Sequence, residues 1–288
     1  MKFLSTVVIA AVLAAPAMAT TLRVTVTNNQ AAPTAGVAGF ALTPVYSAFH
    51  NGVFDSFDVG AQVSAGVEQL AEIGSPSLLP AERTALGVSP GSTAINVADG
   101  RPIFGGETVY GDVEITDFAN QRFFSFLSMV VPTNDTFIGN ADSTAFDLFN
   151  DDGTFAGPLT INITGLGVYD AGTEVNDSSA TGGAAFSAIA NGGEGVNERA
   201  TSGGVSEGFT GLSEFLGTNT VPGFQIDPAL GGSGFFDDFN NAALFNVATI
   251  TIEISPVPLP AGGVLLLSAM GFAGFVSRRK SRAAKAAA

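Results

Sequence analysis

The chain has 288 residues, no cysteine and a formal net charge of −15 at pH 7. Without cysteine it forms no disulfide, so its stability must come from a packed core, for which 24 phenylalanines are available. Strong negative charge repels nucleic acid and anionic lipid, which argues against a nucleic-acid-binding function.

The first 19 residues have the pattern of a secretory signal peptide. Lys2 precedes an apolar run over residues 3–15, and Ala17 and Ala19 form the small-x-small pattern recognised by signal peptidase. The alternative is an N-terminal membrane anchor, but the run is short for a membrane span. We therefore predict that residues 1–19 are removed on export.

The predicted exported body, residues 20–256, is much more acidic than the whole chain. It holds five of the basic residues and all 26 acidic ones, a formal balance of −21. Such a charge favours solubility outside the cell and attracts divalent cations.

Alternating apolar residues predict a mainly β body. An almost continuous apolar run at 123–131 predicts a central strand covered on both faces, which Pro132 ends. Further strands are predicted at 22–26, 109–115, 161–168 and 248–254.

One short helix interrupts this pattern. Ser64 is a suitable N-cap, apolar residues between 67 and 71 share one face, and Gly74 stands where a helix ends. A second short helix is predicted at 79–86. Residues 180–234 are rich in glycine and lack a sustained period, which predicts long surface loops or partial disorder.

The C-terminal tail, residues 256–288, has the layout of a membrane-sorting signal. Sixteen apolar or small residues, 261–276, predict a short hydrophobic transmembrane helix, and the basic cluster after it predicts a cytoplasmic end. The helix follows a short proline-containing motif, which consists of Val257, Pro258, Leu259, Pro260 and Ala261.

This tail resembles the VPLPA-CTERM variety of PEP-CTERM sorting signals. The resemblance implies that an exosortase-type transpeptidase cuts the chain near the motif. The protein would be held in the membrane by the tail before processing and lie at the cell surface or outside the cell afterwards. The alternative is a plain C-terminal anchor.

Three motifs lie within the body. The first is HNGVFDSFDVG at 50–60, which SAGVEQLAEIG follows; the others are SMVVPTNDTFIG at 128–139 and YDAGTE at 169–174. In this order they resemble the spondin N-terminal domain, over roughly residues 22–174. The resemblance implies an antiparallel β-sandwich over residues 20–255, akin to the calcium-dependent membrane-binding modules.

The resemblance also implies a calcium ion held by Asp135, Asp170 and Glu174. Position 174 departs from the commonest animal form, which has Asp there, but a Glu carboxylate can still bind calcium through one or two oxygens. Calcium prefers six to eight hard oxygen ligands, and loops at strand ends can supply them.

No catalytic residue is predicted. His50 is the only histidine, and we interpret it as a structural residue; the nucleophile-elbow, zinc-protease and phosphate-loop motifs are missing. We expect a non-catalytic, calcium-binding, adhesive protein of the cell surface or biofilm matrix, with exopolysaccharide or a surface receptor as partner. The alternatives are a carbohydrate-active hydrolase on a β-sandwich and a purely structural matrix component.

Overall fold

The structure is a computed structural model that describes residues 20–87, 91–95, 100–176, 178, 201–218, 225–228 and 241–256. The chain divides into two units, Met1–Ile254 and Ser255–Ala288, and only the first two residues of the second are described.

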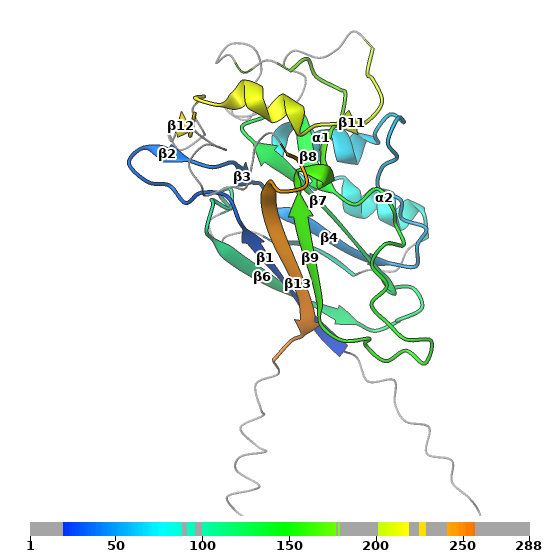
Figure 1. Cartoon of the computed structure of the whole chain (residues 1–288). Helices are drawn as coiled ribbons and strands as arrows, with labels where there is room; N and C mark the ends of the chain where they lie inside the picture. The colour runs from blue at the N-terminus through cyan, green and yellow to red at the C-terminus, as the bar shows by residue number, and fades with distance from the viewer. Residues whose placement is uncertain are drawn as a thin grey trace, which may run out of the picture. The chain divides into compact units, whose positions relative to one another are not determined.

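A four-stranded antiparallel sheet joins the two ends of the first unit. Its order is β6 (Thr108–Ile115), β1 (Thr20–Asn28), β13 (Asn246–Ile254) and β9 (Leu159–Thr164). In β1 the residues Leu22, Val24 and Val26 are buried while their neighbours are only half-buried, because successive side chains of a strand point to opposite faces. The first and last strands are direct neighbours, with Leu22 opposite Ile254 (Figure 1).

A second antiparallel sheet has seven strands. Its main path runs through β11 (Ser206–Glu207), β10 (Val168–Asp170), β8 (Thr136–Gly139), β7 (Phe123–Val131), β4 (Val45–His50) and β5 (Ser92–Ile95), and β3 (Ala41–Leu42) also pairs with β7. A small parallel pair joins β2 (Val37–Ala38) to β12 (Gln225–Ile226).

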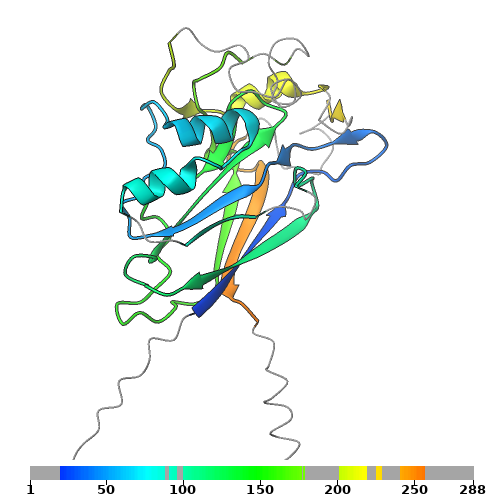
Figure 2. The same ribbon diagram turned by 180° about the vertical axis from the view of Figure 1, so that it is seen from behind.

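Hydrophobic side chains fill both sides of the seven-stranded sheet. On one side, Phe124 and Phe126 of β7 belong to the same core cluster as Val24 of β1 and Ile250 of β13. On the other side, Leu127 clusters with residues of α1 (Ala65–Ile73) and with Leu79 at the start of α2 (Leu79–Ala85). Figures 1 and 2 show the two helices on the side of this sheet away from β1 and β13. Double coverage explains why β7 is apolar at every position except Ser125 and Ser128.

Helix α1 is held at both ends. Ser64 Oγ accepts the Val67 N–H at 3.3 Å, and Glu82 of α2 accepts the Gly66 N–H at 2.7 Å. Gly74 ends the helix in the left-handed region at φ 70°, and a Cβ there would lie 2.3 Å from Thr43 Cγ2. The two predicted helices are confirmed as α1 and α2.

The strands predicted near 22–26, 109–115, 123–131 and 248–254 are confirmed, whereas the single strand predicted at 161–168 is wrong. The chain leaves the four-stranded sheet after Thr164, makes the 3-10 turn η1 (Gly165–Gly167), and enters the other sheet at Val168. Gly165 permits this crossing because a Cβ there would lie 2.5 Å from the Phe209 ring.

The expectation of surface loops at 180–234 does not hold for the part near η2 (Thr210–Phe215). Phe209, Leu212 and Phe215 are buried in the main core. These residues recur at every third position, as in a 3-10 helix, but the element is only six residues long, so its pattern is not sustained enough to indicate burial from the sequence.

The described residues include no helix long and apolar enough to cross a membrane. The predicted helix at 261–276, the signal-peptide residues Ala17 and Ala19, and the motif at 257–261 lie outside the described residues.

Candidate metal centre

The three predicted calcium ligands come from neighbouring strand ends. Asp135 lies in the turn between β7 and β8, Asp170 is the last residue of β10, and Glu174 follows in the next loop. Because β8 and β10 are antiparallel, with Thr136 opposite Asp170, the start of one strand meets the end of the other.

Asp135 holds the loop after β10 in place. Its Oδ2 accepts the main-chain N–H groups of Thr173 at 2.9 Å and Glu174 at 3.0 Å, and the Thr173 hydroxyl at 3.3 Å. Its main-chain carbonyl accepts the Ala171 N–H at 3.1 Å. Hydrogen bonds from N–H groups stabilise the ionised form of a carboxyl group.

Asp170 shapes the same loop from its other end. Its Oδ1 accepts the Gly172 N–H at 2.8 Å, and its Oδ2 accepts Asn176 Nδ2 at 2.9 Å. Gly172 has φ 74°, a conformation that L side chains adopt rarely, and it permits the tight turn of this loop.

All three carboxyl groups are withdrawn from solvent. Asp135 and Glu174 are 0% exposed and Asp170 is 5% exposed. Removing an ionised carboxylate from water is unfavourable unless hydrogen bonds or a positive charge compensate for the lost hydration. Three buried carboxyl groups around one loop therefore form an environment that a cation would stabilise.

A segment outside the three motifs packs against this loop. The Gly203 N–H donates to the Gly172 carbonyl at 2.7 Å, and β11 pairs with β10 so that Ser206 lies opposite Asp170. The same segment bonds to the first motif, since Gly60 N–H donates to Val205 O at 2.8 Å. At Gly204 a Cβ would lie 2.3 Å from the Gly60 carbonyl, so only glycine permits this approach.

The donor types in this loop fit calcium. Carboxylate and carboxamide oxygens are the ligands that calcium prefers, and Asn176 adds a buried Oδ1 atom that makes no hydrogen bond. The sequence motifs do not single out Asn176 as a candidate ligand, because it lies two residues beyond the YDAGTE motif. Its only sequence signal is a side-chain oxygen close to Glu174.

The three predicted ligands are not arranged as a complete coordination shell. Within the described part of the chain, no group of three or more His, Cys, Asp or Glu side chains is arranged so that it could hold a metal ion. The hydrogen bonds explain part of this arrangement, because both oxygens of Asp170 and one of Asp135 accept N–H groups of the chain.

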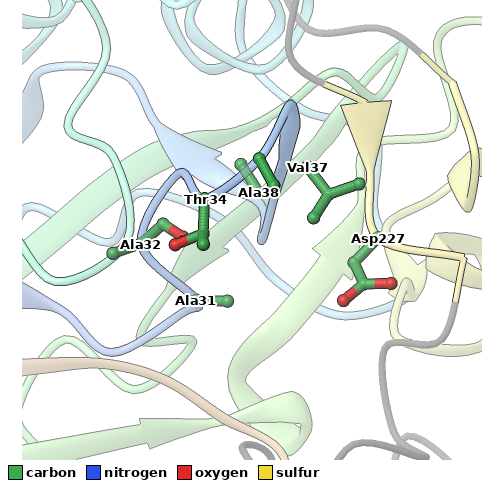
Figure 3. A pocket seen from close by; sticks show the side chains of 7 residues that line it. Ala31, Ala32, Thr34, Val37, Ala38 and Asp227 are labelled. Atoms are coloured by element: carbon green, nitrogen blue, oxygen red, sulfur yellow. The ribbon is translucent and has the colours of Figure 1, made fainter.

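A separate shallow cavity of about 350 Å³ lies beside the β2–β12 pair (Figure 3). Its walls are mostly small apolar side chains, and Thr34 and Asp227 supply the polar groups. None of the predicted calcium ligands lines this cavity.

His50 in the first motif is completely buried and hydrogen-bonded. Its Nδ1 accepts the Gly52 N–H at 3.0 Å, which assigns the ring proton to Nε2, 2.9 Å from Ser125 Oγ. Asn140 Nδ2 donates to the same hydroxyl at 3.1 Å. Burial, and secondarily the charge of Arg83, lower the pKa of His50 to about 4. These contacts agree with the structural role expected from the sequence.

The comparisons with known proteins agree with the motifs. The Spondin_N family model matches residues 30–185, a stretch that contains all three. No curated protein matches the chain. The chain belongs to the spondin N-terminal domain family, and this membership indicates an extracellular protein.

The low pKa of His50 predicts a loss of stability in acid. The ordinary pKa is 6.5, so between about pH 6.5 and 4 the unfolded chain binds the proton before the folded chain does. The free energy of unfolding should therefore fall over this range by roughly 2–3 kcal/mol on account of His50 and be unaffected by it above pH 7. Urea unfolding of the native chain and of His50→Gln at pH 7.5 and 4.5 measures this contribution.

Comparing the two proteins separates the contribution of His50 to the pH dependence of stability from that of the carboxyl groups, which are present in both. The native chain should lose more stability than His50→Gln between the two pH values. An equal loss in both proteins would contradict the assignment.

Proposed function

We propose that this protein is an exported, non-catalytic adhesion protein that binds calcium through Asp135, Asp170 and Glu174. The observation that carries the proposal is the burial of these three carboxyl groups around one loop, which Asp135 holds through the N–H groups of Thr173 and Glu174. Bound calcium would supply positive charge to buried carboxylates and link strand ends that are far apart in the sequence.

The surrounding chain supports this role in two ways. Asn176 places a buried oxygen without a hydrogen bond next to Asp170, and the Gly203–Gly204 segment covers the loop from the other side. Calcium binding would require Asp170 to turn at least one oxygen from its present N–H donors toward the ion. Such a movement is small for a side chain on a short loop.

An adhesive role follows from the family and the charge. Spondin_N membership indicates an extracellular protein, and an acidic body without a predicted catalytic residue is suited to cation-dependent contact with other molecules. The partner that we propose is exopolysaccharide of the surrounding matrix.

The tail completes the proposal. Signal peptidase would cut after Ala19, and an exosortase-type transpeptidase would cut near the motif Val257–Ala261. The hydrophobic segment at 261–276 and the basic residues after it would hold the chain in the membrane only until this second cut.

Calcium titration by calorimetry tests the metal site. The native chain should bind calcium with an affinity in the range of about 0.1–1 mM that is typical of extracellular modules. The combined variant Asp135→Asn, Asp170→Asn and Glu174→Gln should release no binding heat, because it lacks the anionic oxygens.

Asp152→Asn is the matched control. Asp152 is an exposed acid whose Oδ1 accepts the Thr154 N–H within a turn, so this variant should bind calcium as the native chain does. Circular dichroism verifies that each variant is folded. Equal heats from the native chain and the combined variant would rule out the proposed ligands.

Mass spectrometry of the protein recovered from its native cells tests the processing. The mature chain should begin at Thr20 and end at a new C-terminus between residues 257 and 263. Mature surface protein that still contains Arg279 would show that the tail is a lasting anchor.

A further inference from the structure

The outer face of the four-stranded sheet carries two rows of uncharged polar side chains. In one row Thr25 pairs with Tyr110 of β6 and Thr251 of β13, and Thr251 pairs with Thr160 of β9. In the next row Thr27 pairs with Thr108 and Thr249, and Thr249 pairs with Asn162. We call these eight residues the threonine face.

All eight side chains are accessible. They alternate with buried core residues such as Val24, Val26 and Ile250, so they point away from the core, and none of them is buried. Strand spacing places neighbours within a row about 4.8 Å apart and the two rows about 6.8 Å apart. Figure 1 shows β13 and β9 on the near side of the molecule.

Hydrogen bonds hold part of the threonine face in position. Thr27 and Thr108 share a hydrogen bond of 2.9 Å between their hydroxyl oxygens, and Asn29 Nδ2 donates to Thr249 Oγ1 at 2.7 Å. A hydroxyl can donate once and accept twice, so these groups can still bind a ligand. Holding them in advance lowers the entropy lost when a ligand binds.

Tyr110 places an aromatic ring at the edge of this surface. It is 60% exposed, and the guanidinium of Arg23 lies over the ring, 4.0 Å from its centre. Arg23 is itself held by Asp112 through contacts of 2.8 and 2.9 Å. Because Arg23 covers one face of the ring, a ligand can contact only the opposite face and the hydroxyl group.

The threonine face carries no charge, although the body as a whole is strongly acidic. The charged residues of the outer surface of this sheet, namely Arg23, Asp112, Glu114 and Glu253, lie beside the rows, toward the start of β1. Threonine is favoured in strands for its branched side chain, which accounts for its abundance. The two rows form an uncharged area because the three acids of this sheet surface all lie toward the start of β1.

We propose that the threonine face binds a neutral polysaccharide. Such a polymer carries hydroxyl groups that can pair with rows of threonine and asparagine, and its sugar rings have apolar faces that can stack on the face of Tyr110 opposite Arg23. An anionic polymer or a second copy of this chain would be repelled by the acidic body. This inference specifies the partner of the proposed adhesive function, but it does not depend on calcium.

Co-sedimentation of the purified full chain with insoluble neutral polysaccharides tests the inference, with a β-glucan, an α-glucan and a galactomannan as probes. The native chain should bind at least one of them. The combined variant Thr160→Val, Thr249→Val and Thr251→Val keeps the branched shape and removes three hydroxyls, and Tyr110→Ala removes the ring. Each should weaken binding about tenfold or more.

Matched controls lie on other surfaces. Thr84→Val on α2 and Phe118→Ala, another exposed aromatic, should bind as the native chain does. Absence of binding to all three polymers, or equal binding by the threonine-face variants and the native chain, would overturn the inference. Dimerisation in solution that Thr251→Arg abolishes would overturn it as well, because a second copy would then be the occupant.

The calcium-site variant separates this inference from the proposed metal site. Asp135→Asn combined with Asp170→Asn and Glu174→Gln should still sediment with the polysaccharide. Binding that needs these acids would contradict the assignment to the threonine face. If the native chain releases no heat with calcium but still binds polysaccharide, only the proposed metal site fails. If it binds calcium but no polysaccharide, only this inference fails.

Discussion

The contact between the Asp135 carboxylate and the N–H groups of Thr173 and Glu174 is the constraint on which the candidate site depends. It joins the turn before β8 to the loop after β10 and brings residues nearly forty positions apart into one buried environment. Since a buried carboxylate needs compensation for its lost hydration, these hydrogen bonds and any cation that binds there act on the same groups. Folding and calcium binding should therefore stabilise each other.

The sequence predicts the fold where one physical signal dominates. Alternation locates β1 and β13, and an almost continuous apolar run locates β7, whose two faces are both covered. The sequence does not indicate β4. All six of its residues are buried, so they show no alternation, and Ser47 and His50 interrupt the apolar run. The error at 161–168 arises because Gly165–Gly167 carry the chain from one sheet to the other, and short pairings such as β2 with β12 have no local signal at all.

The candidate ligands came from resemblance to a family, because acidic loop residues are common and spacing alone does not select three of them. The structure adds what the motifs cannot show, namely the orienting role of Asp135, the buried oxygen of Asn176 and the covering segment around Gly204. It also separates the motif residues by role. His50 and Phe57 pack and bond within the fold, whereas Asp135 and Asp170 lie at strand ends, beside the loop for which calcium binding is proposed.

Amide hydrogen exchange of residues 171–176, with and without calcium, tests the central claim most directly. If calcium binds the closed loop and not the opened one, the amides of Thr173 and Glu174 should exchange about tenfold more slowly at a calcium concentration ten times the dissociation constant. Amides of β1, which lies in the other sheet, serve as the internal reference. Exchange of the loop at the same rate with and without saturating calcium would contradict the account.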